Sequence, residues 1–391
     1  MIIGIPKEIC PGEQQVALIP ANVAALTKRG RQVLVETGAG LAAGHTDQAY
    51  QDAGATVESE RSAVFAKADI IVQVQTAGAN RSNGESDLAL LRKGQLLVGM
   101  MDPLGNPGFA KVLAEHGVTG VAMELIPRIT RAQSMDVLSS MAMVAGYKAV
   151  LIAAGASPRM FPMSMTAAGT LSPARVFIMG VGVAGLQACA TAKRLGAVVE
   201  AYDVRPAARE QILSVGAKPI ELDLKTDEAE GQGGYAKAQS DDFLKRQREL
   251  MGEVLAQQDV VITTAAVPGS KSPILVTAEH VAQMKRGAVI IDLAVERGGN
   301  CELSELGKSV EVNGVTIIGP ANVPATVPHH ASQMYGKNIE NTLAHLVDKD
   351  GALVLDFEDE ITVGTVIAHA GEIPHTRMRE LLGMPAANAA P

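Results

Sequence analysis

Short apolar runs alternate with amphipathic stretches along the first third of the chain. The runs rich in Val, Ile and Leu are predicted strands: Ile2–Ile5, Gln32–Glu36, Ile70–Gln75, Leu96–Met100 and Thr119–Met123. The stretches between them carry apolar residues at helical spacing and are predicted helices: Pro20–Arg29, Asp47–Ala53, Ala63–Lys67, Leu88–Lys93 and Pro107–His116. This alternation is typical of βα units around a mainly parallel sheet.

The alternation stops at a long apolar segment and resumes after it. Val137–Ala156 reads as one long helix, and the Pro- and Met-rich stretch Ser157–Pro173 is predicted to be a loop. A second series of predicted strands follows: Val176–Met179, Val198–Tyr202, Pro219–Leu222, Val260–Thr263, Val289–Leu293 and Thr316–Ile318. A helix near Ser332–Leu346 and short strand-like runs come next, and the Ala- and Pro-rich end, Met384–Pro391, is predicted to fray.

The long apolar segment approaches the length of a membrane span. A spanning helix needs about 20 predominantly apolar residues, and a Lys at its centre costs ~3 kcal/mol. Lys148 lies in the middle of this segment, and the pattern does not recur elsewhere in the sequence. We therefore interpret it as a buried helix that links two domains, and we expect no insertion into the membrane.

Composition narrows the class of protein. A chain of 391 residues is too long for one small core, so two domains are expected. The net charge of -8 argues against a nucleic-acid footprint. Three well-separated cysteines and the absence of CxxC or HExxH spacing predict no disulfide framework and no metal site, in a reducing, cytosol-like compartment. The N-terminus lacks the pattern of a signal peptide.

A dinucleotide-binding fingerprint follows the predicted strand Val176–Met179. Gly180 permits the tight turn, Gly182 lets the backbone approach a pyrophosphate, and Gly185 lets the following helix pack closely on the strand. The helix N-terminus then faces the phosphate charge with free N–H groups. The alternative is a Gly-rich turn in an α/β domain that binds no nucleotide, but strand, glycines and helix all agree with the fingerprint.

An acidic residue stands where the fingerprint expects it. Asp203 ends the next predicted strand, 18 residues after Gly185. A carboxylate there accepts hydrogen bonds from the adenosine ribose and repels a 2′-phosphate, which favours NAD over NADP. Arg205, two residues on, could soften this preference. A second Gly-rich stretch, Gly38-Ala39-Gly40, has its third glycine at Gly44, one residue late, and is interpreted as an ordinary turn.

The segment before the fingerprint resembles a known family. Pro127–Ser140 is similar to the nicotinamide-side loop of transhydrogenase alpha subunits. The similarity extends through most of the chain, in Lys7-Glu8, Pro11-Gly12-Glu13, Thr166–Gly169, Gly180–Gly185, Gly233–Lys237, Asp292-Leu293-Ala294, Gly298–Cys301 and Asn322-Val323-Pro324. The chain resembles the separately encoded first portion of a split alpha subunit.

The resemblance implies roles for individual residues. Arg128, Asp136 and Ser139 would orient the nicotinamide carboxamide and its ribose, and Gln133 would face NADP(H) brought by a partner domain. Without the resemblance, a solvated polar loop is the better interpretation. The resemblance adds cofactor contacts at Val183, Val204, Gln247 and Ala266.

A second loop is implied to act as a lid. Lys225–Asp242 is polar, Gly-rich and without periodicity. Gly234 and Tyr235 resemble the family's mobile loop, in which a tyrosine closes over the bound nucleotide. A surface excursion without such a role is the alternative.

Alanine dehydrogenases share this architecture and are the main alternative. Their chemistry needs an anchor for the substrate carboxylate and groups that move protons. By resemblance those groups are an Arg, a Lys and a His, and the matching positions here are Gln15, Gln75 and approximately Met101. Hydride exchange between two nicotinamides needs none of them. A non-catalytic NAD-binding sensor or structural protein is a further alternative.

These observations give one expectation. The fold is α/β, with two Rossmann-like domains with mainly parallel sheets on either side of a cleft. By resemblance, residues 1–137 plus 327–391 form a discontinuous first domain and residues 138–326 bind NAD(H). The chain would exchange hydride with NADP(H) on a partner subunit while membrane-spanning subunits translocate protons. It would form a homodimer at the inner face of the cell membrane.

Overall fold

The computed structural model describes residues 1–222, 224, 240–266 and 269–385. The chain divides into two compact units: unit 1 contains Met1–Met141 and Pro324–Pro391, and unit 2 contains Ala142–Val323. The sequence-based domain limits, after residue 137 and before residue 327, fall a few residues from these divisions and stay a prediction, as does the cleft. Most of the tail predicted to fray lies outside the described residues.

Unit 1 is built on a seven-stranded sheet with the order β16-β6-β5-β4-β1-β2-β3. Its strands are β1 Ile2–Ile5, β2 Gln32–Glu36, β3 Thr56–Glu58, β4 Ile70–Gln75, β5 Leu96–Met100, β6 Thr119–Ala122 and β16 Val366–Ala368. All neighbouring strands are parallel except β16, which runs antiparallel to β6. The chain reverses its direction of progress between β1 and β4, so their carboxyl ends form the switch point of this sheet.

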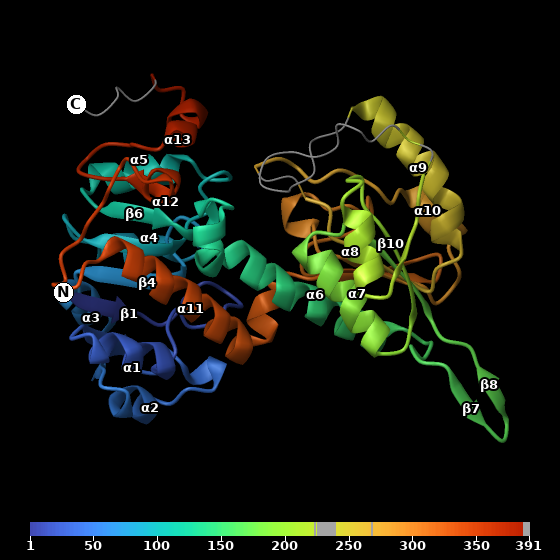
Figure 1. The fold of residues 1–391 in the computed structure, drawn as a ribbon, viewed down its shortest axis with the longest axis horizontal. Helices are drawn as coiled ribbons and strands as arrows, with labels where there is room; N and C mark the ends of the chain where they lie inside the picture. Colours follow the sequence, from blue (N-terminus) through green and yellow to red (C-terminus); the bar gives the residue numbers. More distant parts are fainter. Residues whose placement is uncertain (223, 225–239, 267–268, 386–391) are drawn as a thin grey trace. The chain divides into compact units, whose positions relative to one another are not determined.

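Helices surround this sheet (Figure 1). They are α1 Pro20–Lys28, α2 Asp47–Asp52, α3 Arg61–Lys67, α4 Gly84–Leu88, α5 Gly108–Glu115, α11 Pro328–Leu346, α12 Glu360–Thr365 and α13 Thr376–Leu381, with short 3-10 turns at Leu41–Ala43, Met123–Leu125, Thr130–Met135 and Val323–Thr326. Side-chain caps fix two of the starts: Thr46 Oγ1 accepts from Ala49 N, and Asp359 accepts from Ile361 N. Phe65, Ile71 and Leu97 belong to the fully buried core between helices and sheet.

Unit 2 has a sheet of the same kind, with the order β11-β10-β9-β12-β13-β15-β14. Its strands are β9 Arg175–Met179, β10 Val198–Tyr202, β11 Lys218–Pro219, β12 Val260–Thr263, β13 Val289–Asp292, β14 Lys308–Val312 and β15 Val315–Gly319. Only the β14–β15 pair is antiparallel among these described strands. The switch point lies between β9 and β12, where a ligand is expected in a sheet of this type.

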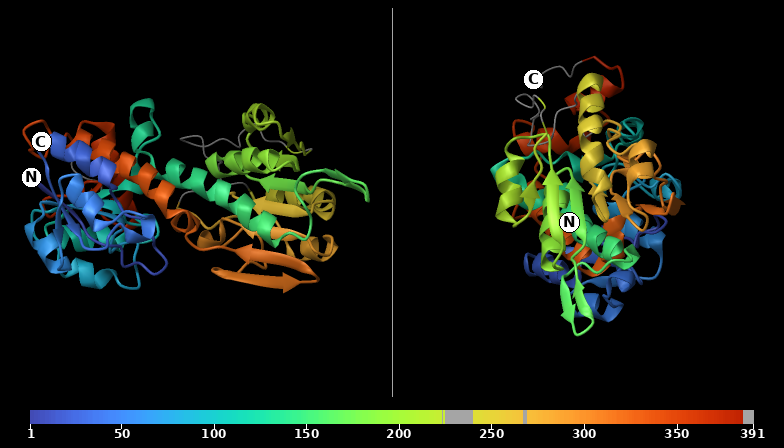
Figure 2. Two further views of the ribbon diagram at one scale, coloured as in Figure 1. Left: turned by 90° about the horizontal axis from the view of Figure 1, so that it is seen from below. Right: turned by 90° about the vertical axis from the view of Figure 1, so that its right-hand side faces the viewer.

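The helices of unit 2 cover its sheet, and a hairpin extends from it. The helices are α7 Val183–Arg194, α8 Ala208–Ser214, α9 Asp241–Ala256 and α10 Ala278–Gln283, with a 3-10 turn at Val295–Arg297. The hairpin consists of β7 Ser164–Thr166 and β8 Gly169–Leu171, which pair antiparallel. Both views in Figure 2 show this ribbon leaving the body of unit 2.

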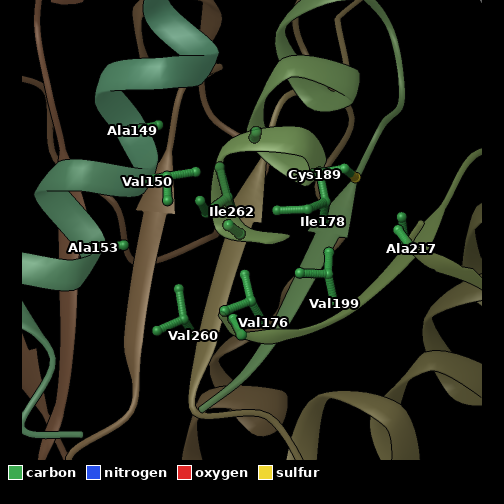
Figure 3. Packing of buried hydrophobic residues seen from close by; sticks show 14 of the residues in the cluster. Ala149, Val150, Ala153, Val176, Ile178, Cys189, Val199, Ala217, Val260 and Ile262 are labelled. Carbon is green, nitrogen blue, oxygen red and sulfur yellow. The ribbon is translucent and has the colours of Figure 1, made fainter. Parts of the chain in front are cut away.

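Helix α6, Val137–Ala156, belongs to both units because the division falls at residue 141. It is the single helix among the described residues that is long and apolar enough to cross a membrane. Ala149, Val150 and Ala153 on this helix are fully buried in the core of unit 2. Figure 3 shows them beside Val176 and Val260 of the sheet. These contacts are those of a core helix.

The predicted α/β fold with two mainly parallel sheets is confirmed, and three local predictions are wrong. The predicted loop Ser157–Pro173 contains the hairpin β7–β8, and the predicted strand Pro219–Leu222 is the shorter β11. The predicted helix Leu88–Lys93 is replaced by α4, which ends at Leu88. The reason is that the Arg92 backbone N–H donates to the Gln95 side chain and its guanidinium to Ala68 O, so this segment turns into β5.

Two glycines of α6 give a matched test of its packing. A Cβ on Gly146 would lie 2.1 Å from the backbone oxygen of Ala184, whereas a Cβ on Gly155 meets nothing within 4 Å among the described residues. We expect Gly146→Ala to lower the free energy of unfolding by about 2–3 kcal/mol through overpacking. Gly155→Ala should raise it by about 0.5 kcal/mol because Ala favours the helix. Urea titration followed by circular dichroism measures both, and equal effects would contradict this packing.

Candidate nucleotide-binding site

The glycine-rich turn after β9 is held by close backbone contacts. Gly180 has a φ of +89°, a conformation that L side chains rarely adopt. A Cβ on Gly180 would lie 2.9 Å from Ala265 N, and a Cβ on Gly185 would lie 1.9 Å from Gly180 O. These two glycines are therefore required by the protein's own backbone, where the start of α7 crosses the end of β9.

Gly182 differs from the other two glycines. It precedes the first residue of α7 with a φ of -74°, which other residues also adopt. A Cβ built on it has no heavy atom of the described residues within 4 Å. Val183, the next residue, is 38% exposed. The start of α7 thus presents its unpaired N–H groups and positive dipole end to open space, as an anion site requires.

Asp203 follows β10 and contacts the same turn. Its Oδ2 accepts from Val181 N at 2.7 Å and from Arg205 Nη2 at 2.8 Å. Its Oδ1 accepts from Arg205 N at 2.9 Å and from Arg205 Nε at 2.8 Å. The guanidinium of Arg205 also donates to Val181 O at 3.1 Å. The carboxylate therefore ties the Gly-rich turn to the end of the neighbouring strand.

Residues from β12 and beyond complete the turn, and the sequence analysis assigned them no role. Thr264 Oγ1 donates to Gly180 O at 2.8 Å. The Asn300 amide donates to Ala265 O and accepts from Ala265 N, each at 2.9 Å. Asn300 is itself fixed by Asp292, a fully buried carboxylate. Asp292 accepts further hydrogen bonds from Thr263, Ala294, Cys301 and Ser304. The only sequence signal was that both lie in segments shared with the family.

The remaining cofactor candidates of unit 2 have different surroundings. Gln247 on α9 is 2% exposed, and its Nε2 donates to Tyr202 Oη at 3.0 Å. Burial raises the pKa of Tyr202 to about 12, so its hydroxyl stays protonated. Val204 packs on the core, and Ala266 is exposed after the end of β12. Gly234 and Tyr235, expected in the lid, lie outside the described residues.

The candidate residues of the loop before α6 lie in unit 1, and three of them are together. Asp136 Oδ1 accepts from Ser139 N at 2.9 Å and its Oδ2 from Ser139 Oγ at 2.6 Å. Asp136 thereby caps the start of α6. Arg128 Nε lies 3.9 Å from Asp136 Oδ2, at the distance of an ion pair. One cation, one carboxylate and one hydroxyl are thus held side by side.

The same loop is fixed to the C-terminal part of unit 1. Ser134 O accepts from the side-chain amides of Asn338 and Asn341 on α11, at 2.9 and 3.0 Å. Arg131 pairs with Asp359 at 2.6 Å, and this hydrogen bond lowers the pKa of Asp359. Gln133, between these anchors, is exposed. The backbone of the loop is positioned while the Gln133 side chain remains accessible in unit 1.

The three positions compared with alanine dehydrogenases carry no acid–base set. The side-chain amides of Gln15 and Gln75 both point toward Glu13, with Nε2 to carboxylate distances of 3.0 and 3.5 Å. Met101 is fully buried. Burial raises the pKa of nearby Glu8 to about 8, and Glu8 accepts from Val74 N and Gln75 N. No group of three or more potential metal ligands occurs among the described residues.

Glu124 supports the carboxyl ends of β5 and β6, just before the candidate loop. Its Oε1 accepts from Met101 N at 2.7 Å and from Asp102 N at 2.8 Å. Its Oε2 is buried and has no hydrogen-bond partner among the described residues. Burial is the main reason that the pKa of Glu124 rises to about 7. Ionisation of this side chain therefore opposes folding.

The sign of the resulting pH dependence can be tested. Because the folded-state pKa of Glu124 is raised, its contribution to stability is complete below pH 4.5 and is lost as the pH rises to about 7. We expect Glu124→Gln to keep the Oε1 contacts and to reduce this fall by about 1–2 kcal/mol. Urea titrations between acidic and neutral pH measure the difference. An unchanged slope in the variant would show that Glu124 ionises without cost.

Known proteins share both units. Two family models match, the N-terminal domain of alanine dehydrogenase/PNT over residues 4–145 and the C-terminal domain over residues 149–376. The chain is 49% identical over 379 residues to the separately encoded first portion of NAD(P) transhydrogenase subunit alpha of Rhodospirillum rubrum, covering 96% of this chain and 98% of that protein. Alanine dehydrogenase of Bacillus subtilis is more distant, at 31% identity over 338 residues, covering 84% of this chain and 81% of that protein.

A solved structure agrees with these sequence matches. The crystal structure of transhydrogenase from Sinorhizobium meliloti superposes with a TM-score of 0.85 at 45% identity, covering 95% of this chain and 100% of that one. The Rossmann-like architecture expected from the sequence is therefore shared with a transhydrogenase structure. The chain belongs to the alanine dehydrogenase/PNT family, in which it is grouped with the transhydrogenase alpha subunits.

Proposed function

We propose that unit 2 binds NAD(H) and that the chain exchanges hydride between this nucleotide and NADP(H) held by a partner polypeptide. The observation that carries the proposal is the contrast among the three glycines. Gly180 and Gly185 are required by internal contacts, whereas the space beside Gly182 is open. A glycine that the fold does not need, at the start of a helix, fits the close approach of a pyrophosphate.

The polar loop of unit 1 supplies the nicotinamide contacts in this proposal. A carboxamide needs both donors and acceptors, which Arg128, Asp136 and Ser139 offer within one cluster. Gln133 is exposed on the same loop and would face the second nucleotide. The bound nicotinamide supplies the hydride, and the side chains orient its ring. Tyr235 and Gly234 would close over the nucleotide, and Val183, Val204, Gln247 and Ala266 would line its site.

Acid–base chemistry is not needed for this exchange, because one ring is reduced as the other is oxidised. Oxidation of an amino acid would need a group that takes up protons and a cation for the substrate carboxylate. Gln15 and Gln75 donate amide hydrogens to Glu13 instead, and Met101 is buried. The hydrogen bonds of unit 1 therefore favour transhydrogenation over alanine dehydrogenation.

The partners follow from the same proposal. The proposed complex adds membrane-spanning subunits, which translocate protons, and an NADP(H)-binding domain. The chain would lie at the cytoplasmic face of the cell membrane. We further propose a homodimer. The hairpin β7–β8 supports this state, since Met163, Met165 and Leu171 on it are 61%, 74% and 50% exposed, and apolar patches of this kind are typical of interfaces.

Gly182→Ala should separate nucleotide binding from folding. The added Cβ meets no described atom, so the free energy of unfolding should change little. It would occupy the space of the pyrophosphate and weaken NADH binding by at least about tenfold. Isothermal titration calorimetry and urea titration measure the two effects, with Gly155→Ala as a control that should bind NADH normally. Normal NADH binding by Gly182→Ala would place the pyrophosphate elsewhere.

The proposed reaction is tested by reconstitution. The purified chain is mixed with the membrane-spanning and NADP(H)-binding subunits, and reduction of an NAD analogue by NADPH is followed by absorbance. We expect exchange only when all partners are present. Oxidation of NADH by the isolated chain with pyruvate and ammonia would establish an amino-acid dehydrogenase instead. NADH binding without exchange in the complete mixture would indicate a non-catalytic nucleotide-binding protein.

A further inference from the structure

Asp203 has no acceptor position left for a ribose. A carboxylate offers about four lone-pair positions to hydrogen-bond donors. All four are taken, one by the backbone N–H of Val181 and three by the backbone and side chain of Arg205. The side chains of both charged residues are largely shielded, with 6% of Asp203 and 14% of Arg205 exposed. The expected ribose ligand is thus already fully hydrogen-bonded within the protein.

Only some of these donors can leave the carboxylate. The Val181 N–H belongs to the Gly-rich turn, which Gly180 and Thr264 fix to the neighbouring strand. The N–H of Arg205 belongs to the chain that directly follows Asp203. The Arg205 guanidinium, by contrast, is at the end of a flexible side chain, and its rotation would free one position on each carboxylate oxygen. Two freed positions match the two hydroxyls of an adenosine ribose.

We propose that Arg205 determines nucleotide specificity by competing with the ribose for Asp203. The inference rests on the proposed NAD(H) binding in unit 2. In the free protein the guanidinium occupies the position of the ribose hydroxyls, and NAD(H) binds by displacing it. The displaced guanidinium stays within reach of the ribose 2′ position, because its backbone lies two residues from Asp203. There it can pair with a 2′-phosphate, for which guanidinium geometry is well suited.

The charges determine opposite effects for the two nucleotides. Removal of the guanidinium leaves Asp203 open to the ribose hydroxyls, so NAD(H) no longer has to displace a competing ion pair. The same removal exposes an uncompensated negative charge to a 2′-phosphate, and it deletes the cation that would receive this phosphate. Arg205 therefore weakens the binding of NAD(H) and tolerates NADP(H), so it narrows the preference that Asp203 alone would impose.

The test is a comparison of affinities for Arg205→Met, which keeps most of the length of the side chain and removes its charge. We expect NADH to bind about fivefold more tightly and NADPH about fivefold more weakly, as the strength of charged hydrogen bonds in a partly solvated site allows. Adenosine, which carries no phosphate, should also gain affinity, and 2′-deoxyadenosine should gain less. Arg205→Lys, a point charge without the bidentate geometry, should lie between the two.

A matched control lies four residues further along the chain. Arg209 pairs with Glu221 at 2.7 Å, and both side chains are more than half exposed. Arg209→Met removes the same charge from the same surface and should change neither affinity. Circular dichroism of each variant reports whether the fold is intact. A merely structural role for Arg205 would weaken NADH, NADPH and adenosine together, which is the result that overturns the inference.

Two failures remain distinguishable. If the unsubstituted chain does not bind NADH, the proposed function is wrong and the inference falls with it. If the unsubstituted chain binds NADH but Arg205→Met leaves the ratio of NADH to NADPH affinity unchanged, the inference alone is wrong. Calorimetric titration of all variants with the four compounds, at low and high salt, covers both cases.

Discussion

The close approach of α7 to the end of β9 is the constraint on which the nucleotide site depends. The position of a Cβ on Gly185 would be 1.9 Å from Gly180 O, so helix and strand meet with no room for a side chain. This contact directs the first turn of α7 toward the carboxyl edge of the sheet. Since the N–H groups of that turn are unpaired within the helix, the sheet ends in an array of donors that suits a phosphate.

Buried polar groups keep this edge in place from the other side of the switch point. Asp292 is fully buried and is satisfied by hydrogen bonds from five residues, including Asn300. Asn300 then holds Ala265 next to the Gly-rich turn. A buried carboxylate is costly unless every lone pair is used, and here most of its donors come from the stretch of chain that follows β13. The network explains why an acidic side chain can end β13 without a counter-ion.

The sequence predicted most strands because each is a short apolar run, as in β4 and β9. It missed the hairpin in Ser157–Pro173, since exposed strands with Pro and Met nearby lack the burial that produces alternation. The predicted helix at Leu88–Lys93 was wrong because long-range acceptors, Ala68 O among them, bind Arg92. Asp203 could be located by spacing, but spacing cannot reveal that Arg205 fills its lone pairs. The contacts of Asn300 likewise depend on tertiary structure.

The division of unit 1 into two sequence segments has a consequence for the order of synthesis. Strand β16 and helix α11 are made after the whole of unit 2, yet unit 1 needs both: β16 completes its sheet, and Ser332 Oγ of α11 accepts from Val16 N at 3.0 Å. Unit 2 is continuous and can become compact while the ribosome is still translating. The apolar edge of β6 then waits for residues that leave the ribosome last, so the first unit in the sequence is the last to be closed.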